Sequence, residues 1–221
     1  MQSTRLPGKV LLDFGGRTVL ENVVRRAQRS KVANAIVATS PDVADDPISD
    51  FCIAKGIPVV RAAAQDDVFR RFLFVLAEYP CDYFLRLTAD CPLIEPKVLD
   101  AIMETAQMIL PQFIAATVAD GMADGLDCEV IRTDAFQRIN PSELSGQELE
   151  HCTMALPRYM YRVPMPGLAA YRSLQRLTLD THADYLRLLD LVGRYGNDLD
   201  TAMLLAALSC AVNPISENTP K

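Results

Sequence analysis

The hydrophobic pattern of this 221-residue chain alternates between helical periodicity and short strand-like runs, and this alternation limits the possible folds more than any other feature. A capping box at Thr18-Val-Leu-Glu21, in which each side chain can bond the other residue's backbone N–H, predicts the start of the first helix. Strands are predicted at residues 35–39, 57–60, 83–88, 113–118 and 128–131, and further helices begin at Asp46, Asp67 and Pro96. Because such alternation produces sheets covered by helices, we expect an α/β fold with a mostly parallel sheet and helices on both faces.

The alternating rhythm breaks between about residues 119 and 178, where glycine and proline separate short elements. We interpret this stretch as a small irregular lobe within a single domain that spans residues 1–221. A strand at 174–179, followed by helices at about 182–195 and 199–211, is expected to complete the domain.

Composition excludes several classes of protein. With 22 Lys and Arg against 28 Asp and Glu, the net charge of −6 argues against a nucleic-acid-binding surface. No run of about 18 apolar residues and no signal peptide is present, so we expect a cytoplasmic protein with no membrane span. The six cysteines form no C-x-x-C pair and are expected to be reduced. Two histidines are too few for a histidine-rich metal site.

Two aspartates, Asp90 and Asp180, follow predicted strands, at the sheet edge where α/β proteins bind ligands. Two carboxylates that meet there favour a hard cation such as Mg²⁺. The alternative is that each aspartate caps the next element. For Asp180 this alternative is weakened, because Thr181-His-Ala-Asp184 supplies its own capping box.

A short loop at the start of the chain, Ser3-Thr-Arg-Leu-Pro-Gly-Lys9, carries two cations beside Gly8. Arg5 and Lys9 can bind a polyphosphate through charge-assisted hydrogen bonds. The loop lacks the Walker A pattern, and a solvated basic N-terminus is the alternative interpretation.

This loop resembles the signature loop of the sugar cytidylyltransferases, such as the 3-deoxy-manno-octulosonate and acylneuraminate enzymes. The chain as a whole looks closer to the related spore coat polysaccharide biosynthesis protein F family. Arg86-Leu-Thr-Ala-Asp-Cys-Pro-Leu-Ile94 resembles the metal-site segment, with Ala89 in place of the usual glycine. Further similar segments are Ala38-Thr-Ser40, Asp45-Asp-Pro47, Asp66-Asp-Val68, Asp124-Gly-Leu-Asp-Cys-Glu-Val130, Glu150-His-Cys-Thr153 and Arg176-Leu-Thr-Leu-Asp-Thr181.

The resemblance implies a Rossmann-like nucleotide-diphospho-sugar transferase fold and a Mg²⁺-dependent enzyme. The implied reaction transfers CMP from CTP to an acidic sugar and releases pyrophosphate, for cell-surface polysaccharide biosynthesis. It implies that Asp90 and Asp180 hold Mg²⁺ and that Arg5, Lys9 and Asp90 are catalytic residues. The residues implied to bind nucleotide are Ser3, Arg5, Lys9, Thr39, Asp67, Arg86 and Asp90, and those implied to bind the acceptor sugar are Asp127, Glu129 and His151.

On this interpretation residues 1–118 form the nucleotide-binding part and 119–178 an acceptor-sugar and dimerisation lobe. Residues 179–221 contribute the metal-ligand strand end and the C-terminal helices. Relatives are commonly homodimers, so we expect a homodimer, and the stretch Tyr159-Met-Tyr161 is a candidate interface or part of the core.

Simpler interpretations remain open for several of these residues. Asp67 is most simply a helix N-cap. Asp124-Gly125 is typical of a turn before a strand, and His151 suits a packed or capping residue equally well. Arg86 pairs either with a buried carboxylate or with the nucleotide.

Two other functions also remain open. One is a glycosyltransferase on the same fold, which the sequence Asp90-Cys-Pro in place of a D-x-D motif disfavours. The other is an inactive nucleotide-binding or scaffold protein. The family's signature loop usually follows a hydrophobic strand that is missing before Met1, so we expect Met1 to be an internal methionine of a longer chain.

Overall fold

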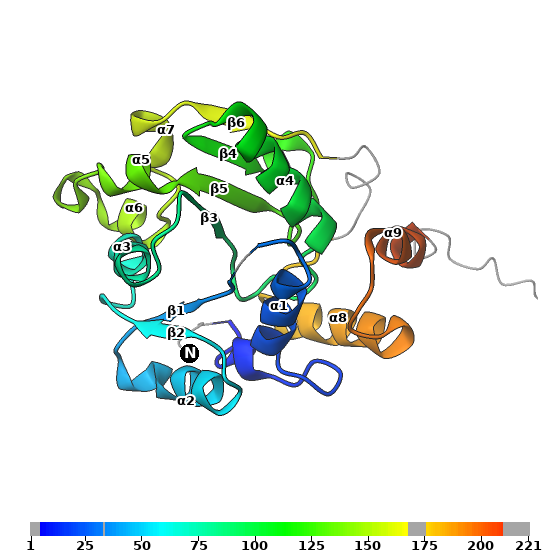
Figure 1. The fold of residues 1–221 in the computed structure, drawn as a ribbon. Coiled ribbons are helices and arrows are strands. Elements are labelled where there is room, and N and C mark those ends of the chain that lie inside the picture. The colour runs from blue at the N-terminus through cyan, green and yellow to red at the C-terminus, as the bar shows by residue number, and fades with distance from the viewer. Residues whose placement is uncertain (1–4, 33, 168–175, 210–221) are drawn as a thin grey trace, which may run out of the picture.

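A computed structural model describes residues 5–32, 34–167 and 176–209, which form a mixed α/β fold of the expected class (Figure 1). The described strands are β1 Val37–Thr39, β2 Val59–Arg61, β3 Tyr83–Arg86, β4 Phe113–Ala116, β5 Cys128–Arg132 and β6 Arg162–Pro164. The helices are α1 Val19–Gln28, α2 Asp46–Ala54, α3 Val68–Glu78, α4 Pro96–Ile109, α5 Thr133–Gln137, α6 Gly146–Glu150, α7 Leu156–Tyr159, α8 His182–Tyr195 and α9 Thr201–Ser209. Short 3₁₀ helices are η1 Lys9–Leu11, η2 Val43–Asp45, η3 Val118–Asp120 and η4 Pro141–Glu143.

The described strands form two sheets. β1 and β2 pair in parallel, and the larger sheet has the order β3-β5-β4-β6. β3 and β4 both pair antiparallel with β5, and β6 is parallel to β4, so β5 runs opposite to the other three. Two consecutive strands that pair in parallel need a long crossover connection, usually a helix. Residues 117–127, which join β4 to β5, contain only the short η3, so β5 pairs antiparallel with β4.

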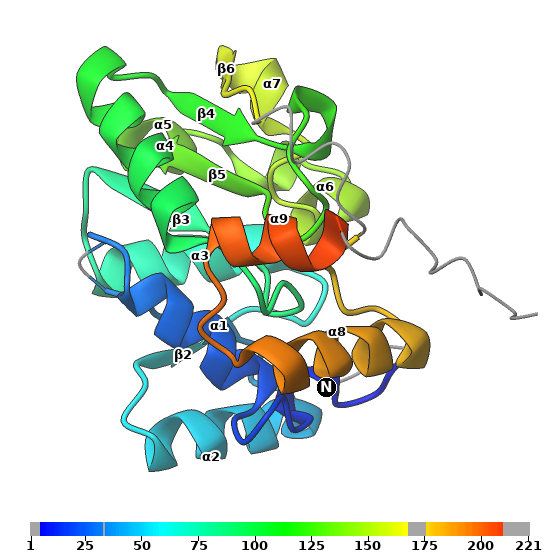
Figure 2. The ribbon, with the colours of Figure 1, turned by 90° about the vertical axis from the view of Figure 1, so that its right-hand side faces the viewer.

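Helices and loops cover both faces of the larger sheet, as the buried β4 shows. Ile114 and Ala116 pack in the same apolar cluster as α1, α4 and α8. Phe113 and Ala115 point the other way, into a cluster with α3, α5 and α7. Side chains alternate between the faces of a strand, so a strand of four buried residues requires cover on both sides. Figure 2 shows α8 and α9 along one side of the molecule, near α1.

The start of the first helix follows the prediction only in part. Thr18 Oγ1 accepts a hydrogen bond from Glu21 N at 3.1 Å, as an N-cap should. The Glu21 carboxylate instead pairs with Arg25 at 2.9 Å and Lys55 at 3.2 Å, so half of the capping box is replaced by ion pairs. The capping box of Thr181 and Asp184 at the start of α8 is complete.

The strand expected at 174–179 is not borne out. Residues 174 and 175 lie outside the described residues, and 176–179 form no regular strand. The backbone of this segment bonds loops instead of a neighbouring strand: Leu177 N donates to Asp124 O at 2.7 Å and Leu179 N to Asp90 O at 2.8 Å.

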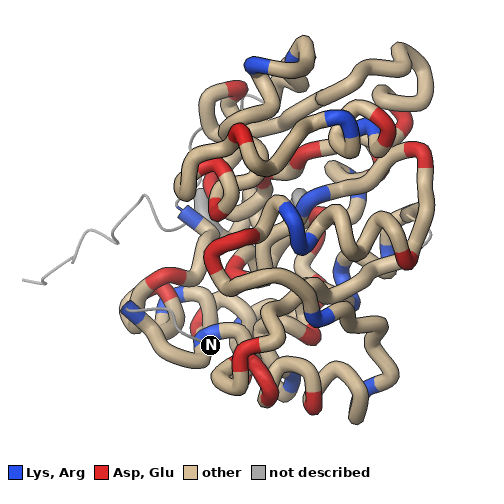
Figure 3. The backbone as a smooth tube through the Cα atoms, turned by 90° about the vertical axis from the view of Figure 1, so that its left-hand side faces the viewer, with Lys and Arg blue, Asp and Glu red and all other residues tan. Residues whose placement is uncertain are grey.

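Three further properties concern the residues that the structure describes. No helix in the described part of the chain is both long and apolar enough to cross a membrane. The cysteines at positions 52, 81, 91, 128 and 152 have free thiols. Figure 3 shows acidic and basic residues interspersed along the face in view.

A fully buried arginine, Arg26 on α1, joins three parts of the chain. Its guanidinium donates to the carbonyl oxygens of Ile94 at 2.6 Å, Asn197 at 3.0 Å and Leu199 at 2.8 Å. Glu95 lies 3.7 Å away and supplies the opposite charge. A buried cation with this many partners ties α1 to the loop before α4 and to the segment between α8 and α9.

We predict that Arg26→Met lowers the free energy of unfolding by about 3 kcal/mol or more, because it leaves the buried carbonyls of Ile94 and Leu199 without their donor and Glu95 without its opposite charge. Urea denaturation followed by circular dichroism measures this loss. Arg29→Met is the matched control, since Arg29 and its partner Asp198 are about half exposed, and we expect less than about 1 kcal/mol. Equal losses in the two variants would contradict a central role for Arg26.

Candidate active site

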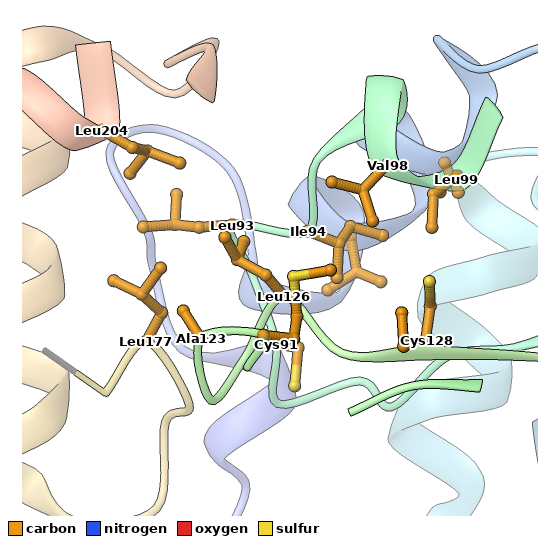
Figure 4. Close-up of a cluster of buried hydrophobic side chains, with 14 of the residues drawn as sticks. Cys91, Leu93, Ile94, Val98, Leu99, Ala123, Leu126, Cys128, Leu177 and Leu204 are labelled. Atoms are coloured by element: carbon orange, nitrogen blue, oxygen red, sulfur yellow. The ribbon is translucent and has the colours of Figure 1, made fainter. Parts of the chain in front are cut away.

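Three loops that carry aspartates are anchored in one hydrophobic cluster (Figure 4). Leu93 follows Asp90 and is fully buried. Leu126, which follows Asp124, and Leu177, which precedes Asp180, are buried as well. Because close-packed side chains leave little room for movement, each buried leucine fixes the position of the polar residue near it.

The segment before Asp180 lies directly against the other two loops. Besides its backbone bonds to Asp124 and Asp90, it approaches Gly125 so closely that a Cβ there would lie 2.6 Å from the carbonyl carbon of Leu177. Gly125 also has a φ of +96°, which side-chain-bearing residues rarely adopt. Glycine at this position therefore lets Asp180 approach Asp90.

Lys9 is the side chain on which the two predicted metal ligands converge. It is the first residue of η1 and follows Gly8, which has a φ of 68°. Its Nζ donates to Asp90 Oδ2 at 2.7 Å, to Asp180 Oδ1 at 2.9 Å and to the backbone oxygen of Leu179 at 2.9 Å. Hydrogen bonds from one nitrogen thus join three residues that were predicted to act together, Lys9, Asp90 and Asp180.

The other oxygen of Asp180 faces two arginines. Arg5 Nη2 lies 3.2 Å from Asp180 Oδ2, so the fourth predicted residue also reaches this group. Arg176 pairs with the same oxygen and, through Nε, with Asp124 Oδ2 at 2.7 Å. Arg176 begins a segment that resembles the family but was not among the predicted site residues, because residue spacing does not reveal the geometry of an irregular segment.

These contacts set the charge of the site. Burial alone would lower the pKa of Lys9, but hydrogen bonds and charge interactions with Asp90 and Asp180 raise it above its ordinary value. Burial would raise the pKa of Asp180, yet hydrogen bonds from Lys9 and Arg176 lower it to about 2. At neutral pH the site therefore contains the ionised carboxylate of Asp180 beside the ammonium group of Lys9.

The donor atoms of this site fit a hard cation. The ammonium group of Lys9 already occupies a point reached by two carboxylate oxygens and one carbonyl oxygen. Oxygen donors of this kind suit Mg²⁺, which typically takes one or two carboxylates and completes its shell with water and substrate oxygens. Among the described residues, no group of three or more His, Cys, Asp or Glu is arranged to hold a metal ion.

The remaining predicted nucleotide-binding residues have partners within the protein. Arg86 Nη1 pairs with Glu129 Oε2 at 2.9 Å, because the two residues lie directly opposite each other on β3 and β5. Thr39 is buried and its hydroxyl donates to Asp45 at 2.9 Å. Asp67 caps α3 through Arg70 N at 3.0 Å. Ser3 lies outside the described residues.

The predicted acceptor-sugar residues have different surroundings. Asp127 accepts a hydrogen bond from Gly125 N at 3.0 Å, and Glu129 is paired with Arg86. His151 is exposed and lines a separate hollow of about 600 Å³ with Glu150, Gln65, Asp66 and Val68. The lining of this hollow does not include Lys9, Asp90 or Asp180, so His151 stays a prediction without contact to the charged centre.

Comparison with known proteins defines the family. Residues 1–120 match the family model described as Cytidylyltransferase. The chain is 30% identical over 221 residues to the spore coat polysaccharide biosynthesis protein SpsF of Bacillus subtilis (strain 168), an alignment that covers 95% of this chain and 90% of that protein. It is 32% identical over 108 residues to a 3-deoxy-manno-octulosonate cytidylyltransferase of Chelativorans sp. (strain BNC1), covering 47% and 41% of the two chains.

A solved structure extends the likeness to the whole fold. A cytidylyltransferase from Leptospira borgpetersenii serovar Hardjo-bovis (strain JB197) superposes with a TM-score of 0.88 at 27% identity, covering 100% of this chain and 95% of that one. The expected nucleotide-diphospho-sugar transferase fold is thereby confirmed. The chain belongs to the cytidylyltransferase family, and as such it is a CTP-dependent nucleotidyltransferase.

The low pKa of Asp180 predicts a dependence of stability on pH. Because the folded protein holds this carboxylate ionised down to about pH 2, the unfolded chain binds more protons below about pH 4. The ion pairs of Asp180 thus contribute about 1 to 2 kcal/mol above pH 5, and this contribution is lost as the pH falls toward 2. Urea denaturation of the wild type and Asp180→Asn at pH 7 and pH 3 measures it.

The difference in unfolding free energy between the two proteins should be smaller at pH 3 than at pH 7. Asp50→Asn, at an exposed position on α2, is the control and should show no such change. A wild-type advantage that is equal at both pH values would show that Asp180 is not held ionised by its neighbours.

Proposed function

We propose that this protein transfers CMP from CTP to an acidic sugar and releases pyrophosphate. The observation that carries the proposal is the convergence of Asp90 and Asp180 on one cation, with Arg5 beside them. The bond between the α- and β-phosphates of CTP breaks, and a sugar oxygen forms the new bond to the α-phosphorus. Pyrophosphate leaves with the electron pair of the broken bond, and the proton of the attacking oxygen passes to water.

We propose Asp90 and Asp180 as the residues that hold Mg²⁺. When bound, the metal supplies positive charge to phosphate oxygens and to the attacking oxygen. Asp180 itself is a poor proton acceptor, because a carboxylate with a pKa of about 2 remains ionised at neutral pH. Its proposed role is to hold a cation and not to act as a general base.

Arg5 and Lys9 are proposed to bind the triphosphate. Arg5 is well placed to meet a ligand from solvent, since its side chain is 62% exposed, whereas that of Lys9 is only 13% exposed. Cations positioned before the reaction stabilise the charge that develops on the leaving pyrophosphate. We assign Ser3, Thr39, Asp67 and Arg86 to the nucleotide side of the site on the resemblance alone.

The acceptor sugar is proposed to bind along residues 119–178, with Asp127, Glu129 and His151 as candidate contacts. The names of the relatives support a carbohydrate acceptor: one is a spore coat polysaccharide biosynthesis protein and another a 3-deoxy-manno-octulosonate cytidylyltransferase. Glu129 already pairs with Arg86, so a sugar hydroxyl that reached Glu129 would have to share that carboxylate.

We predict that the protein releases pyrophosphate from CTP when Mg²⁺ and a suitable acidic sugar are present, and that UTP and ATP are poorer substrates. A coupled pyrophosphate assay with 3-deoxy-manno-octulosonate and N-acetylneuraminate is the first measurement. Asp90→Asn should reduce kcat by about 100-fold or more, because it removes a charge from the reacting centre. Asp50→Asn on α2 is the control, because it makes the same chemical change at an exposed position outside the site, and it should retain activity.

Two results would point elsewhere. Hydrolysis or transfer of a nucleotide-linked sugar without pyrophosphate release would favour a glycosyltransferase. A folded protein that binds no nucleotide would favour a scaffold.

We also propose a homodimer that uses the surface around α7 and β6. Tyr161 is 80% exposed and Met154 55% exposed, whereas Met160 between them in sequence is buried in the core. We expect light scattering to give a mass near twice 24.4 kDa, and Tyr161→Lys to shift it toward the monomer. A monomer at high protein concentration would rule the dimer out.

A further inference from the structure

The ammonium group of Lys9 has used all of its hydrogen-bonding capacity. A lysine ammonium carries three N–H donors and no acceptor. The three donors are directed at Asp90 Oδ2, Asp180 Oδ1 and Leu179 O, at distances from 2.7 to 2.9 Å. In this arrangement Lys9 has no donor left for a phosphate oxygen, so it has to give up at least one partner before it can bind a triphosphate.

The partners of Lys9 are also the oxygens that a divalent cation would take. A Mg²⁺ ion binds oxygen at about 2 Å, closer than an ammonium nitrogen does. Two cations that require the same two carboxylate oxygens cannot occupy the space between them together. Whichever is present excludes the other.

We propose that a divalent cation displaces Lys9 from Asp90 and Asp180, and that this displacement frees Lys9 to bind the triphosphate. Metal and nucleotide binding are then coupled: each favours the arrangement that the other requires. The proposal rests on the proposed function, because it takes the metal site and the triphosphate from there.

The structure allows this exchange without rearranging the rest of the site. The flexible four-carbon side chain of Lys9 can swing while η1 keeps its backbone. Asp180 keeps its position through Oδ2, which Arg5 and Arg176 contact and Lys9 does not. Asp90 stays in place because the residues that follow it are buried.

Binding of Mn²⁺ alone, followed by electron paramagnetic resonance, tests the exchange without nucleotide or activity. In Lys9→Met the competing cation is gone, and we expect Mn²⁺ to bind about tenfold or more tightly than in the wild type. A gain of this size means that, in the wild type without metal, Lys9 is away from the two carboxylates for about a tenth of the time or less.

Arg5→Met is the matched control, because it also removes one positive charge beside Asp180 but from the oxygen that Lys9 does not use. Its exposed ion pair should change Mn²⁺ affinity by about threefold or less. Circular dichroism confirms that both variants are folded. Equal gains in the two variants would mean general electrostatics and would overturn the exchange.

Acylation of lysines in the wild-type protein, read by mass spectrometry, gives an independent measure. Lys9 should be protected without divalent cation and become more reactive as Mg²⁺ is added, whereas Lys31, 75% exposed, should not change. Saturating Mn²⁺ binding with no change at Lys9 would overturn the proposal. Absence of Mn²⁺ binding in both wild type and Lys9→Met would also overturn it, while pyrophosphate release from CTP would still test the enzymatic function separately.

Discussion

Burial of the apolar residues that follow Asp90 is the constraint on which the rest of the site depends. Leu93 and Ile94 lie in the core, and side chains of α1 hold the same loop by hydrogen bonds. Asn22 Nδ2 donates to the carbonyl of Pro92 at 2.7 Å, and Arg26 donates to that of Ile94. A loop fixed by both packing and hydrogen bonds holds Asp90 at one position, so that Lys9 and Asp180 have a defined group to meet.

Charge compensation then organises the residues around Asp180. A carboxylate with little exposure is costly unless it is paired, and Asp180 is paired on both oxygens, with Lys9 on one and with Arg5 and Arg176 on the other. The result is a group that stays ionised far below neutral pH. On the proposed mechanism such a centre would bind cations and anions with the same residues: the carboxylates would hold a metal, and the released Lys9 would bind phosphate.

Much of the fold was predictable because its signals are local. The β4 strand shows as a run of apolar residues, and the helices begin where a capping side chain or a proline stands, as at Asp67 and Pro96. The capping box of Thr181 and Asp184 depends only on two residues that are three positions apart in the sequence. The predictions that failed depend on long-range contacts. The backbone of segment 176–179 bonds to two loops, and Glu21 pairs with Lys55, the residue that follows α2.

The sequence by itself determined the class of fold and the family, and it predicted that Arg5, Lys9, Asp90 and Asp180 act together, because periodicity and motif spacing are properties of neighbouring positions. Only the tertiary structure decided that Lys9 lies between the two carboxylates and that Arg176 joins Asp180 to Asp124. Lys9 and Asp90 are 81 positions apart, and Lys9 and Asp180 are 171 apart. Contacts over such separations depend on how the core packs, because no local preference of the backbone brings these groups together.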